Sequence, residues 1–470
     1  MGKCNILSCY CYCGKIPLRL VLVIMLHLAL QNCYNLRVVL NVAIVEMVEP
    51  PESTNISESA CPQYETVNIV REGGKFPWPR NTEALVLYAF FFGYILSHVP
   101  GGWLADKYGG RYVLGMSVFA SALVTSIFPY FTIKGGHWVA VTLRALLGLA
   151  QGPILPTVSS FVSTWVPSFE RTLLGGIAYG GTNLGTILGS IFTGIIIEAS
   201  DSWKMAFYVW SSLACVYIIL HLFFVFSFPS THPFLPEEEL EYLKKHIVVK
   251  RSLKTPWKAI LSNVPYWANI AGQFGHNYIF FTLVTYLPTY MKEILQFEIS
   301  KNGLYSAVPF IALWSCSIIL SITGNYIVNS MKFMSPLAFS RFFGTFSNLG
   351  AAGFSLAAVY VGCSRGWAIG LYVAGMCIKA FYYMTLPTNI NELSKNYGGI
   401  MFGICNGISA LSGIFGNALV GALTKNKRLG EWKIVFWINF GVAVVTSIIY
   451  ILWSSSERQP FDYEEEESPQ

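Results

Sequence analysis

The sequence predicts an all-α membrane protein with twelve transmembrane helices in two six-helix halves. Of its 470 residues, 54% are hydrophobic and only 12% are charged, whereas soluble domains carry about 25% charged residues. This composition excludes a soluble multidomain protein and a disordered chain. Because a spanning helix needs about 20 mostly apolar residues, we expect helices over the following runs: 19–48, 84–104, 111–131, 137–163, 172–197, 203–228, 265–291, 301–325, 336–361, 365–389, 398–423 and 431–454.

The polar connections and termini divide the chain into segments 1–18, 19–228, 229–264, 265–454 and 455–470. Basic residues are enriched in cytoplasmic loops, so the six in 229–264 favour a cytoplasmic linker, N-terminus and acidic tail. Residues 49–83 then form an outer loop, in which Asn55 begins a glycosylation sequon. One connection disagrees, because Lys425, Lys427 and Arg428 would face outward. Within the linker, Pro236 with acids after it and bases later predicts a short helix.

Charge and cysteines exclude several classes of protein. The net charge is +6, but the basic residues lie in short clusters between apolar runs, which favours membrane topology over a nucleic-acid partner. The eleven cysteines show no spacing typical of a metal site or a disulfide framework. Palmitoylation and free thiols both remain open for the four that precede the first run: Cys4, Cys9, Cys11 and Cys13.

The second half of the chain repeats features of the first. Trp203-Lys204 at the start of the sixth run recurs as Trp432-Lys433 in the twelfth, and the Leu-Pro-Thr of the fourth run, at Pro156, recurs in the tenth. Glycines spaced by four residues occur in the fifth and eleventh runs, where they permit close helix packing. Two halves joined by a basic loop are typical of a secondary transporter that holds its substrate between them.

The connection between the second and third runs carries the strongest local motif, Gly-Trp-Leu-Ala-Asp-Lys-Tyr-Gly-Gly-Arg over residues 102–111. Its glycines permit a tight turn, and we expect Asp106, Lys107 and Arg111 to form a charge latch that depends on conformation. The motif resembles the loop signature of the major facilitator superfamily. Gly110 departs from it by replacing the first closing basic residue, and an unrelated glycine-rich turn is the alternative.

Three cations lie deep inside predicted spans, where burial of an arginine costs about 2.5–3.5 kcal/mol. Counted from the outer ends, Arg37, Arg144 and Lys379 lie about 16, 12 and 21 Å deep. No aspartate accompanies them in any span, so they favour an anionic substrate. Gln151 follows two turns after Arg144 on the same face, and His276 is a further candidate for binding substrate. The alternative is that these side chains only hold helices together.

Asn389 and Glu392 close the tenth run and are candidates for an inner gate. The sequence contains no nucleotide-binding loop, metal cluster or catalytic triad. We therefore expect neither an enzyme nor a bound cofactor, and we expect transport to be driven by an ion gradient rather than by ATP.

Longer motifs resemble the family of sodium/phosphate cotransporters, sialin and vesicular glutamate transporters, most of all the inorganic phosphate cotransporters. The resemblance covers about residues 15–461 and is carried by the Arg-Val-Val-Leu-Asn-Val-Ala-Ile-Val run from Arg37, Phe92-Gly93-Tyr94, the Arg-Ala-Leu-Leu-Gly-Leu-Ala-Gln-Gly run from Arg144, and Leu287-Pro288-Thr289-Tyr290. It implies the major facilitator fold and that Arg37 and Arg144 hold the anion.

Four positions depart from members of this family. Gln151 stands where the sialin-like and vesicular members have a glutamate tied to proton coupling, although phosphate-type members also carry glutamine. Leu87 and Ser159 replace histidines, and Tyr286 replaces a glutamate. The dileucine signal typical of sialin is absent from the N-terminal segment. These departures weaken the expectation of proton coupling and of a lysosomal address.

The sequence thus predicts a monomeric secondary transporter that moves phosphate or an organic carboxylate by alternating access, coupled to sodium or protons. A plasma-membrane location is favoured over a vesicle or lysosome. The alternatives are an uncoupled or potential-driven anion carrier, and a receptor or scaffold derived from a transporter that no longer cycles.

Overall fold

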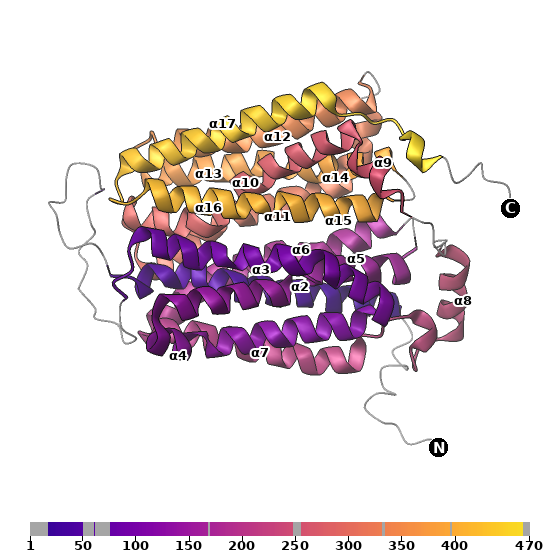
Figure 1. Cartoon of the computed structure of the whole chain (residues 1–470), viewed down its shortest axis with the longest axis horizontal. Helices are drawn as coiled ribbons and strands as arrows, with labels where there is room; N and C mark the ends of the chain where they lie inside the picture. Colours follow the sequence, from indigo (N-terminus) through magenta and orange to yellow (C-terminus); the bar gives the residue numbers. More distant parts are fainter. Residues whose placement is uncertain are drawn as a thin grey trace, which may run out of the picture.

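The computed structural model describes residues 17–49, 61, 76–167, 170–247, 255–330, 334–394 and 397–463. The N-terminal cysteines, Asn55 and the acidic run 464–467 lie outside the described residues. The long helices run along the longest axis of the molecule (Figure 1). We call the end that carries α8 (Glu237–His246) and α9 (Trp257–Leu261) the inner end, and the opposite end the outer end.

Six spans form the N-terminal half, and one continuous helix, α4, contains the third span and the first part of the fourth. Gly136 has φ 70° and ψ −159°, so it breaks the continuous helix α4 into the predicted third and fourth spans. The second span begins at Arg80, directly after Pro79, four residues earlier than predicted. The helices of this half are α2 (Leu18–Met47), α3 (Arg80–Tyr108), α4 (Gly110–Gln151), α5 (Ile154–Trp165), α6 (Arg171–Ser200) and α7 (Trp203–Phe224).

The other six spans form the C-terminal half. The linker between the halves contains η1 (Pro229–Thr231), α8 and α9, and α8 confirms the short helix predicted after Pro236. The remaining elements are α10 (Val264–Glu293), α11 (Ile299–Ser330), α12 (Pro336–Ala358), α13 (Arg365–Lys379), η2 (Ala380–Met384), α14 (Leu386–Leu393), α15 (Gly398–Ser409), α16 (Leu411–Leu423), α17 (Leu429–Trp453) and η3 (Pro460–Asp462).

Nine helical segments of the described chain are long and apolar enough to cross a membrane. One of them, Gly110–Trp165, contains two spans because of the break at Gly136. The other two of the twelve spans are α10 and α12, whose apolar character is reduced by polar side chains, among them Gln273 and Asn348. Both of these side chains are buried, so the polar residues face the interior of the bundle rather than lipid.

Spans four and ten are broken at equivalent positions, as the sequence repeat implies. In span four α4 ends at Gln151 and α5 begins at Ile154, with Pro156 in its first turn. In span ten α13 ends at Lys379, a 3₁₀ segment follows, and α14 begins with Leu386-Pro387. Proline favours such a start, because it lacks the N–H that the preceding turn would bond.

Close helix packing depends on some of the predicted glycines. A Cβ atom at Gly181 of α6 would overlap the carbonyl oxygen of His27 in α2, so only glycine permits this approach. The prediction fails in part for span eleven, where Gly403 faces open space, although Gly407 lies against His98 of α3.

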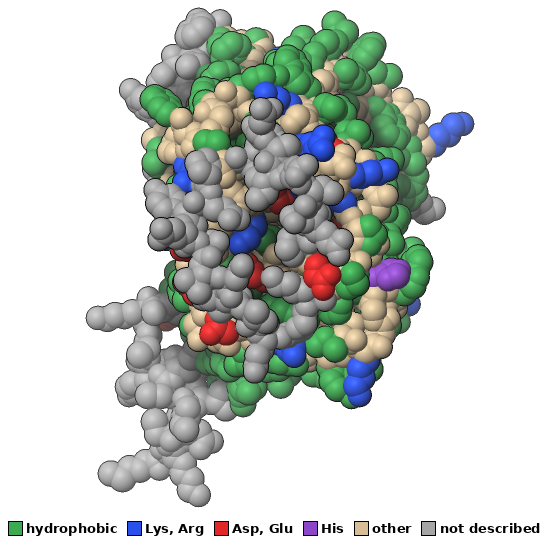
Figure 2. Space-filling view, turned by 90° about the vertical axis from the view of Figure 1, so that its left-hand side faces the viewer, with side chains coloured by type: hydrophobic (Ala, Val, Ile, Leu, Met, Phe, Trp, Pro, Cys, Tyr) green, Lys and Arg blue, Asp and Glu red, His purple; other side chains and the backbone are tan. Residues whose placement is uncertain are grey.

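The outer end is held together by a disulfide that the cysteine spacing did not reveal. Cys61 of the predicted outer loop bonds Cys363, which follows α12, with a Cα–Cα distance of 5.3 Å. The Cys61 N–H also donates to the carbonyl of Ile294, at 3.3 Å. Both partners belong to the C-terminal half, so this loop links the two halves. Charged side chains gather on this end face, whereas the flanks are hydrophobic (Figure 2).

The disulfide and the predicted orientation are tested together by labelling with a membrane-impermeant maleimide. On intact cells we expect Cys61 and Cys363 to react only after treatment with an impermeant reductant, because the bond lies on the outer face. Cys61→Ser should expose the Cys363 thiol to the label without reduction, whereas Cys215→Ser, which removes a free thiol in α7, should not. Labelling that requires permeabilised cells would contradict the orientation.

Candidate functional site

The Arg37 side chain lies in a cage of aromatic rings contributed by both halves of the protein. Its Cζ atom is 4.4 Å from the ring centroid of Phe90, 4.9 Å from Phe91 and 5.0 Å from Phe281 of α10. Two tyrosine rings complete the cage, at 5.5 and 6.0 Å: Tyr34 and Tyr94. No hydrogen bond or ion pair among the described residues engages this guanidinium, so the ring faces are its contacts.

Arg144 approaches the same cage from α4. Its Nη1 donates to the backbone carbonyl of Arg37 at 3.4 Å, and its Cζ lies 5.5 Å from the Phe90 ring. Its Nε is buried with no hydrogen-bond partner in the described part of the chain. A buried guanidinium N–H without an acceptor carries a large desolvation cost, which an anion entering beside it would remove. Arg37 and Arg144 thus both contact the Phe90 ring.

Gln151 lies beside Arg37 but makes a backbone contact. Its Nε2 donates to the carbonyl of Cys33 in α2 at 2.9 Å. Arg37, Gln151, Tyr34 and Tyr94 line one small pocket of about 10 Å³, which is room for about one water molecule. A phosphate or carboxylate requires more space than this, so the cage must open before an anion can enter.

Lys379 and His276 form a separate pair within the C-terminal half. The Lys379 Nζ lies 2.9 Å from the His276 carbonyl oxygen and 3.2 Å from its Nδ1. The imidazole stacks on the Tyr382 ring with centroids 3.5 Å apart, and the Tyr382 hydroxyl donates to Gln273 at 2.6 Å. No contact between described residues joins this pair directly to Arg37 or Arg144, and its predicted role in binding substrate stays a prediction.

The predicted gate residues are dispersed. Arg111 donates to the carbonyl of Leu222 in α7 at 2.7 Å, and the Lys107 Nζ lies 4.7 Å from the Trp103 ring. The side chain of Asp106 lies outside the described residues. At the other broken span, the Asn389 Nδ2 donates to the Tyr450 hydroxyl at 3.1 Å, while Glu392 is half-buried. Asn389 thus packs within the C-terminal half rather than between the halves.

A buried ion cluster closes the outer end, and the sequence analysis did not identify it. Arg80 of α3 contacts Glu83 at 2.9 Å, Glu293 of α10 at 3.0 Å and the hydroxyl of Thr424 at 2.9 Å. Lys427 lies 3.6 Å from Glu83 and 3.7 Å from Glu293. We call these five residues the outer ion cluster. It joins α3 of one half to α10 and the α16–α17 turn of the other.

A second ion pair, between Lys292 of α10 and Glu46 of α2 at 3.6 Å, joins the halves beside this cluster. Every ion pair that links the halves within the described ranges lies at this end. The structure therefore represents a state in which the outer ends are closed. The signal for the cluster was present in the sequence, because Lys427 belongs to the connection that disagreed with the distribution of basic residues. Glu83 and Glu293 balance the charge of Lys427, which explains how a basic residue can lie at the outer end.

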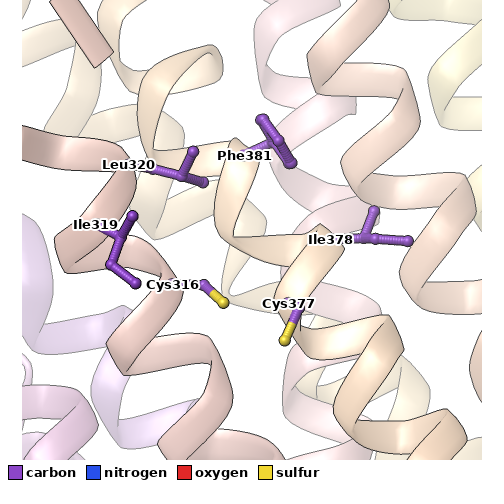
Figure 3. A pocket seen from close by; sticks show the side chains of 6 residues that line it. All are labelled: Cys316, Ile319, Leu320, Cys377, Ile378 and Phe381. Atoms are coloured by element: carbon purple, nitrogen blue, oxygen red, sulfur yellow. The ribbon is translucent and has the colours of Figure 1, made fainter. Parts of the chain in front are cut away.

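An apolar cavity of about 270 Å³ lies between α11 and α13, away from the arginines. Figure 3 shows its lining side chains, which include two cysteines and no charged group: Cys316, Ile319, Leu320, Cys377, Ile378 and Phe381. The only polar groups that this cavity offers an anion are two weakly donating thiols, so the arginine cage is the candidate anion site.

A family model and three relatives give consistent results. A family model described as Major Facilitator Superfamily matches residues 66–417. The chain is 31% identical over 458 residues to a protein of Drosophila ananassae named "Putative inorganic phosphate cotransporter", with 95% of each covered. It is 32% identical over 435 residues to sialin of Homo sapiens, which covers 91% of this chain and 87% of sialin. It is 29% identical to vesicular glutamate transporter 2 of Homo sapiens, over 98% of this chain and 78% of that protein.

Solved structures share the fold. A bacterial homologue of the human lysosomal transporter Spinster, in an inward-facing and unoccupied conformation, superposes with a TM-score of 0.67 at 12% identity, over 94% of this chain and 98% of that one. A D-xylose–proton symporter gives a TM-score of 0.65 at 14% identity, over 93% of this chain and 98% of that one. The family model and these relatives are of transporters rather than enzymes.

We expect Glu293→Gln to open the outer end, because it removes the carboxylate that accepts hydrogen bonds from Arg80. Loss of one charge-assisted bond is about 1.5–3 kcal/mol, which shifts the closed–open equilibrium roughly 10- to 150-fold. The measurement is the rate at which a cysteine introduced at Tyr286 reacts with an impermeant maleimide. Lys301→Gln, which breaks an exposed ion pair with Glu298 at the same end, is the control. Equal rates for both variants would contradict a gating role for the cluster.

Proposed function

The chain belongs to the Major Facilitator Superfamily and, within it, to the family of inorganic phosphate cotransporters, sialin and vesicular glutamate transporters; on that basis we propose that its cargo is phosphate or an organic carboxylate. We propose that it moves this anion between two membrane faces by alternating access, with Arg37 and Arg144 as the ligands. The relatives named for phosphate and glutamate transport support the class of cargo.

One observation carries this proposal: two buried guanidinium groups converge on Phe90 without any carboxylate among their contacts in the described chain. Uncompensated cations are unfavourable in the membrane interior, where the low dielectric strengthens every charge interaction. An anion that enters between them supplies the missing charge and accepts hydrogen bonds from both. Each guanidinium can present two parallel N–H groups to a carboxylate or phosphate.

The position of the cage explains how binding becomes transport. Arg37 lies on α2 of the first half, yet Phe281 of the second half packs on its guanidinium. When the halves rock apart at one end, the rings from the two halves separate and the pocket opens toward that side. In the state described here the outer ion cluster holds the halves together, so the anion would exchange with the inner side.

Two rival functions remain as alternatives. An uncoupled carrier would share the arginine cage but would equilibrate the anion without a driving cation. A receptor or scaffold that no longer cycles is disfavoured by the cage and by the intact turn at Gly109, whose φ of 89° requires glycine. Its family establishes that the chain is a multi-pass membrane protein. We propose that it resides in the plasma membrane and that it is a monomer.

Transport in proteoliposomes tests the function. We expect the purified protein to take up radiolabelled inorganic phosphate or gluconate and to exchange it for unlabelled anion on the other side of the membrane. An uncoupled carrier would show the exchange and would accumulate the anion under a voltage gradient, but not under a sodium or proton gradient at zero voltage. A scaffold would show neither.

The arginine ligands are tested by Arg144→Lys, which keeps the charge but loses the planar pair of N–H groups. We expect the apparent affinity for the anion to weaken by about 1.5–3 kcal/mol, as for a lost charge-assisted bond. Arg341→Lys serves as the control, since Arg341 bonds Ser454 at the inner end. Retention of wild-type affinity by Arg144→Lys, with loss only in Arg144→Ala, would show that the residue supplies potential rather than directed hydrogen bonds.

Gln151→Glu should make uptake fall more steeply with rising pH than it does in the wild type. A protonated glutamic acid can still donate to the Cys33 carbonyl, as the glutamine Nε2 does. An ionised glutamate cannot donate, and its negative charge beside Arg37 would compete with the substrate. Uptake is measured across acid and neutral pH, and Gln151→Asn provides a neutral comparison. A pH profile identical to that of the wild type would exclude Gln151 from the anion pocket.

A further inference from the structure

We propose that Lys379 and His276 together bind the proton that is coupled to anion transport. The proposal rests on the anion transport proposed above, and it gives this pair a different role from that of a substrate ligand. The Lys379 side chain is 0% exposed, and its Nζ contacts the carbonyl oxygen and the Nδ1 atom of one histidine. Both polar contacts lie inside the C-terminal half rather than toward the arginine cage.

The chemistry of the pair permits one exchangeable proton. The imidazole Nδ1 can accept an N–H from the ammonium only when Nδ1 itself carries no proton. Lysine and histidine cannot both be charged at 3.2 Å in a buried site, because like charges at that distance destabilise each other. The pair therefore carries one positive charge when loaded and none after it releases a proton to one side of the membrane.

Within the described residues of the C-terminal half, no carboxylate and no second amine or imidazole lies at the depth of this pair. Around the pair lie Tyr382, whose hydroxyl is bonded to Gln273, and Ser347 of α12, which donates to the Lys379 carbonyl at 2.9 Å. Cys377 lies on the same helix and Cys316 on α11, while α17 presents Thr446 and Tyr450. By sequence, the other charged residues of the helices that surround the pair lie near helix ends: Lys292, Glu293, Lys301, Arg341, Arg365, Glu392, Glu431 and Lys433.

The same observation disfavours sodium at this point. A sodium ion requires oxygen ligands and gains most from carboxylates, whereas this site presents an amine and an imidazole. A cation placed beside Lys379 would be repelled by the ammonium. A proton is the cation that these two side chains can bind.

Aromatic rings connect the pair to the anion cage. The His276 ring lies 6.4 Å from Phe280, Phe280 lies 5.8 Å from Phe281, and Phe281 lies 5.0 Å from the Arg37 Cζ atom. These rings provide no solvent to screen charge between the two sites. An anion in the cage therefore favours the protonated pair, and by thermodynamic reciprocity the protonated pair favours anion binding. This coupling predicts that the anion and the proton move in the same direction.

Lys379 also lies where protonation can influence the conformational change. Lys379 is the last residue of α13, where span ten changes from α-helix to the 3₁₀ segment η2. A break of this kind is a point at which one part of a helix can move relative to the other. Movement of η2 would displace Tyr382, which covers one face of the His276 ring, and so would alter which side of the membrane the pair contacts.

The test compares pH-driven accumulation with exchange in proteoliposomes that hold the full-length protein. The probes are radiolabelled inorganic phosphate and gluconate, and gluconate stays ionised at neutral pH. Lys379→Arg places a side chain that cannot release its proton, and His276→Gln retains an acceptor for the lysine but cannot be protonated. For Lys379→Arg we expect the ratio of pH-driven accumulation to exchange to fall to the value measured without a gradient. For His276→Gln, which keeps the lysine, we expect the pH dependence of this ratio to shift from that of the wild type. Elution as a single species in detergent checks that each variant is folded.

Lys301→Gln, which removes an exposed lysine of the same half, should keep the wild-type ratio. Accumulation by both variants in proportion to their exchange, as in the wild type, would overturn the proton site. Wild-type accumulation that follows a sodium gradient and ignores pH would overturn it as well. A wild-type protein that exchanges neither probe would instead contradict the proposed anion transport, on which this inference rests.

Discussion

Three cations are buried with no carboxylate partner in the part of the chain that the structure describes, and the other features of the molecule have to be compatible with this burial. Arg37 is held by aromatic faces, Arg144 by one backbone carbonyl and the same ring, and Lys379 by one histidine. Each arrangement is weaker than an ion pair in a medium of low dielectric. The protein therefore keeps a positive potential at its centre, which an anion can satisfy and a metal cation cannot. The buried Asn348 of α12 donates to the Gly272 carbonyl of α10, and Gln273 of α10 accepts from Tyr382, so these polar side chains lie inside the C-terminal half.

Ionic contacts are used differently at the outer end. There Arg80 and Lys427 have full carboxylate partners from both halves, and the Cys61–Cys363 bond links the outer loop to the second half. These interactions favour contact between the halves without occupying the proposed anion pocket. Their strength has to be matched by what the anion contributes at the centre, since a carrier must leave each of its states in turn. The separation of a closing cluster from a binding cage makes these two contributions independently adjustable.

The buried cations Arg144 and Lys379 lie on the two broken spans, four and ten. Span four presents Arg144 and Gln151 just before its break, and span ten presents Lys379 at its own. Duplication thus places a cation at the corresponding region of each half, although their partners differ. Arg144 shares a ring with another arginine, whereas Lys379 faces an imidazole. The anion and proton roles proposed here follow from that difference in partners, because a guanidinium retains its proton and an amine can release it.

The class of protein, its spans, its internal duplication and the depth of Arg37 and Arg144 in the membrane could be predicted from the amino-acid sequence. Hydrophobic runs, repeat spacing and charges within apolar runs are local properties of the chain. The sequence could not determine which distant residues meet. The Cys61–Cys363 bond joins residues 302 positions apart, and the outer ion cluster combines Arg80 and Glu293, 213 positions apart. For the same reason the sequence analysis placed Lys379 with the two arginines. The depth of a residue along a helix can be counted from the sequence, but the direction of its side chain cannot. That Lys379 faces His276 follows from the packing of α13 against α10 within the C-terminal half, because contacts between helices depend on their rotation and crossing rather than on spacing along one of them.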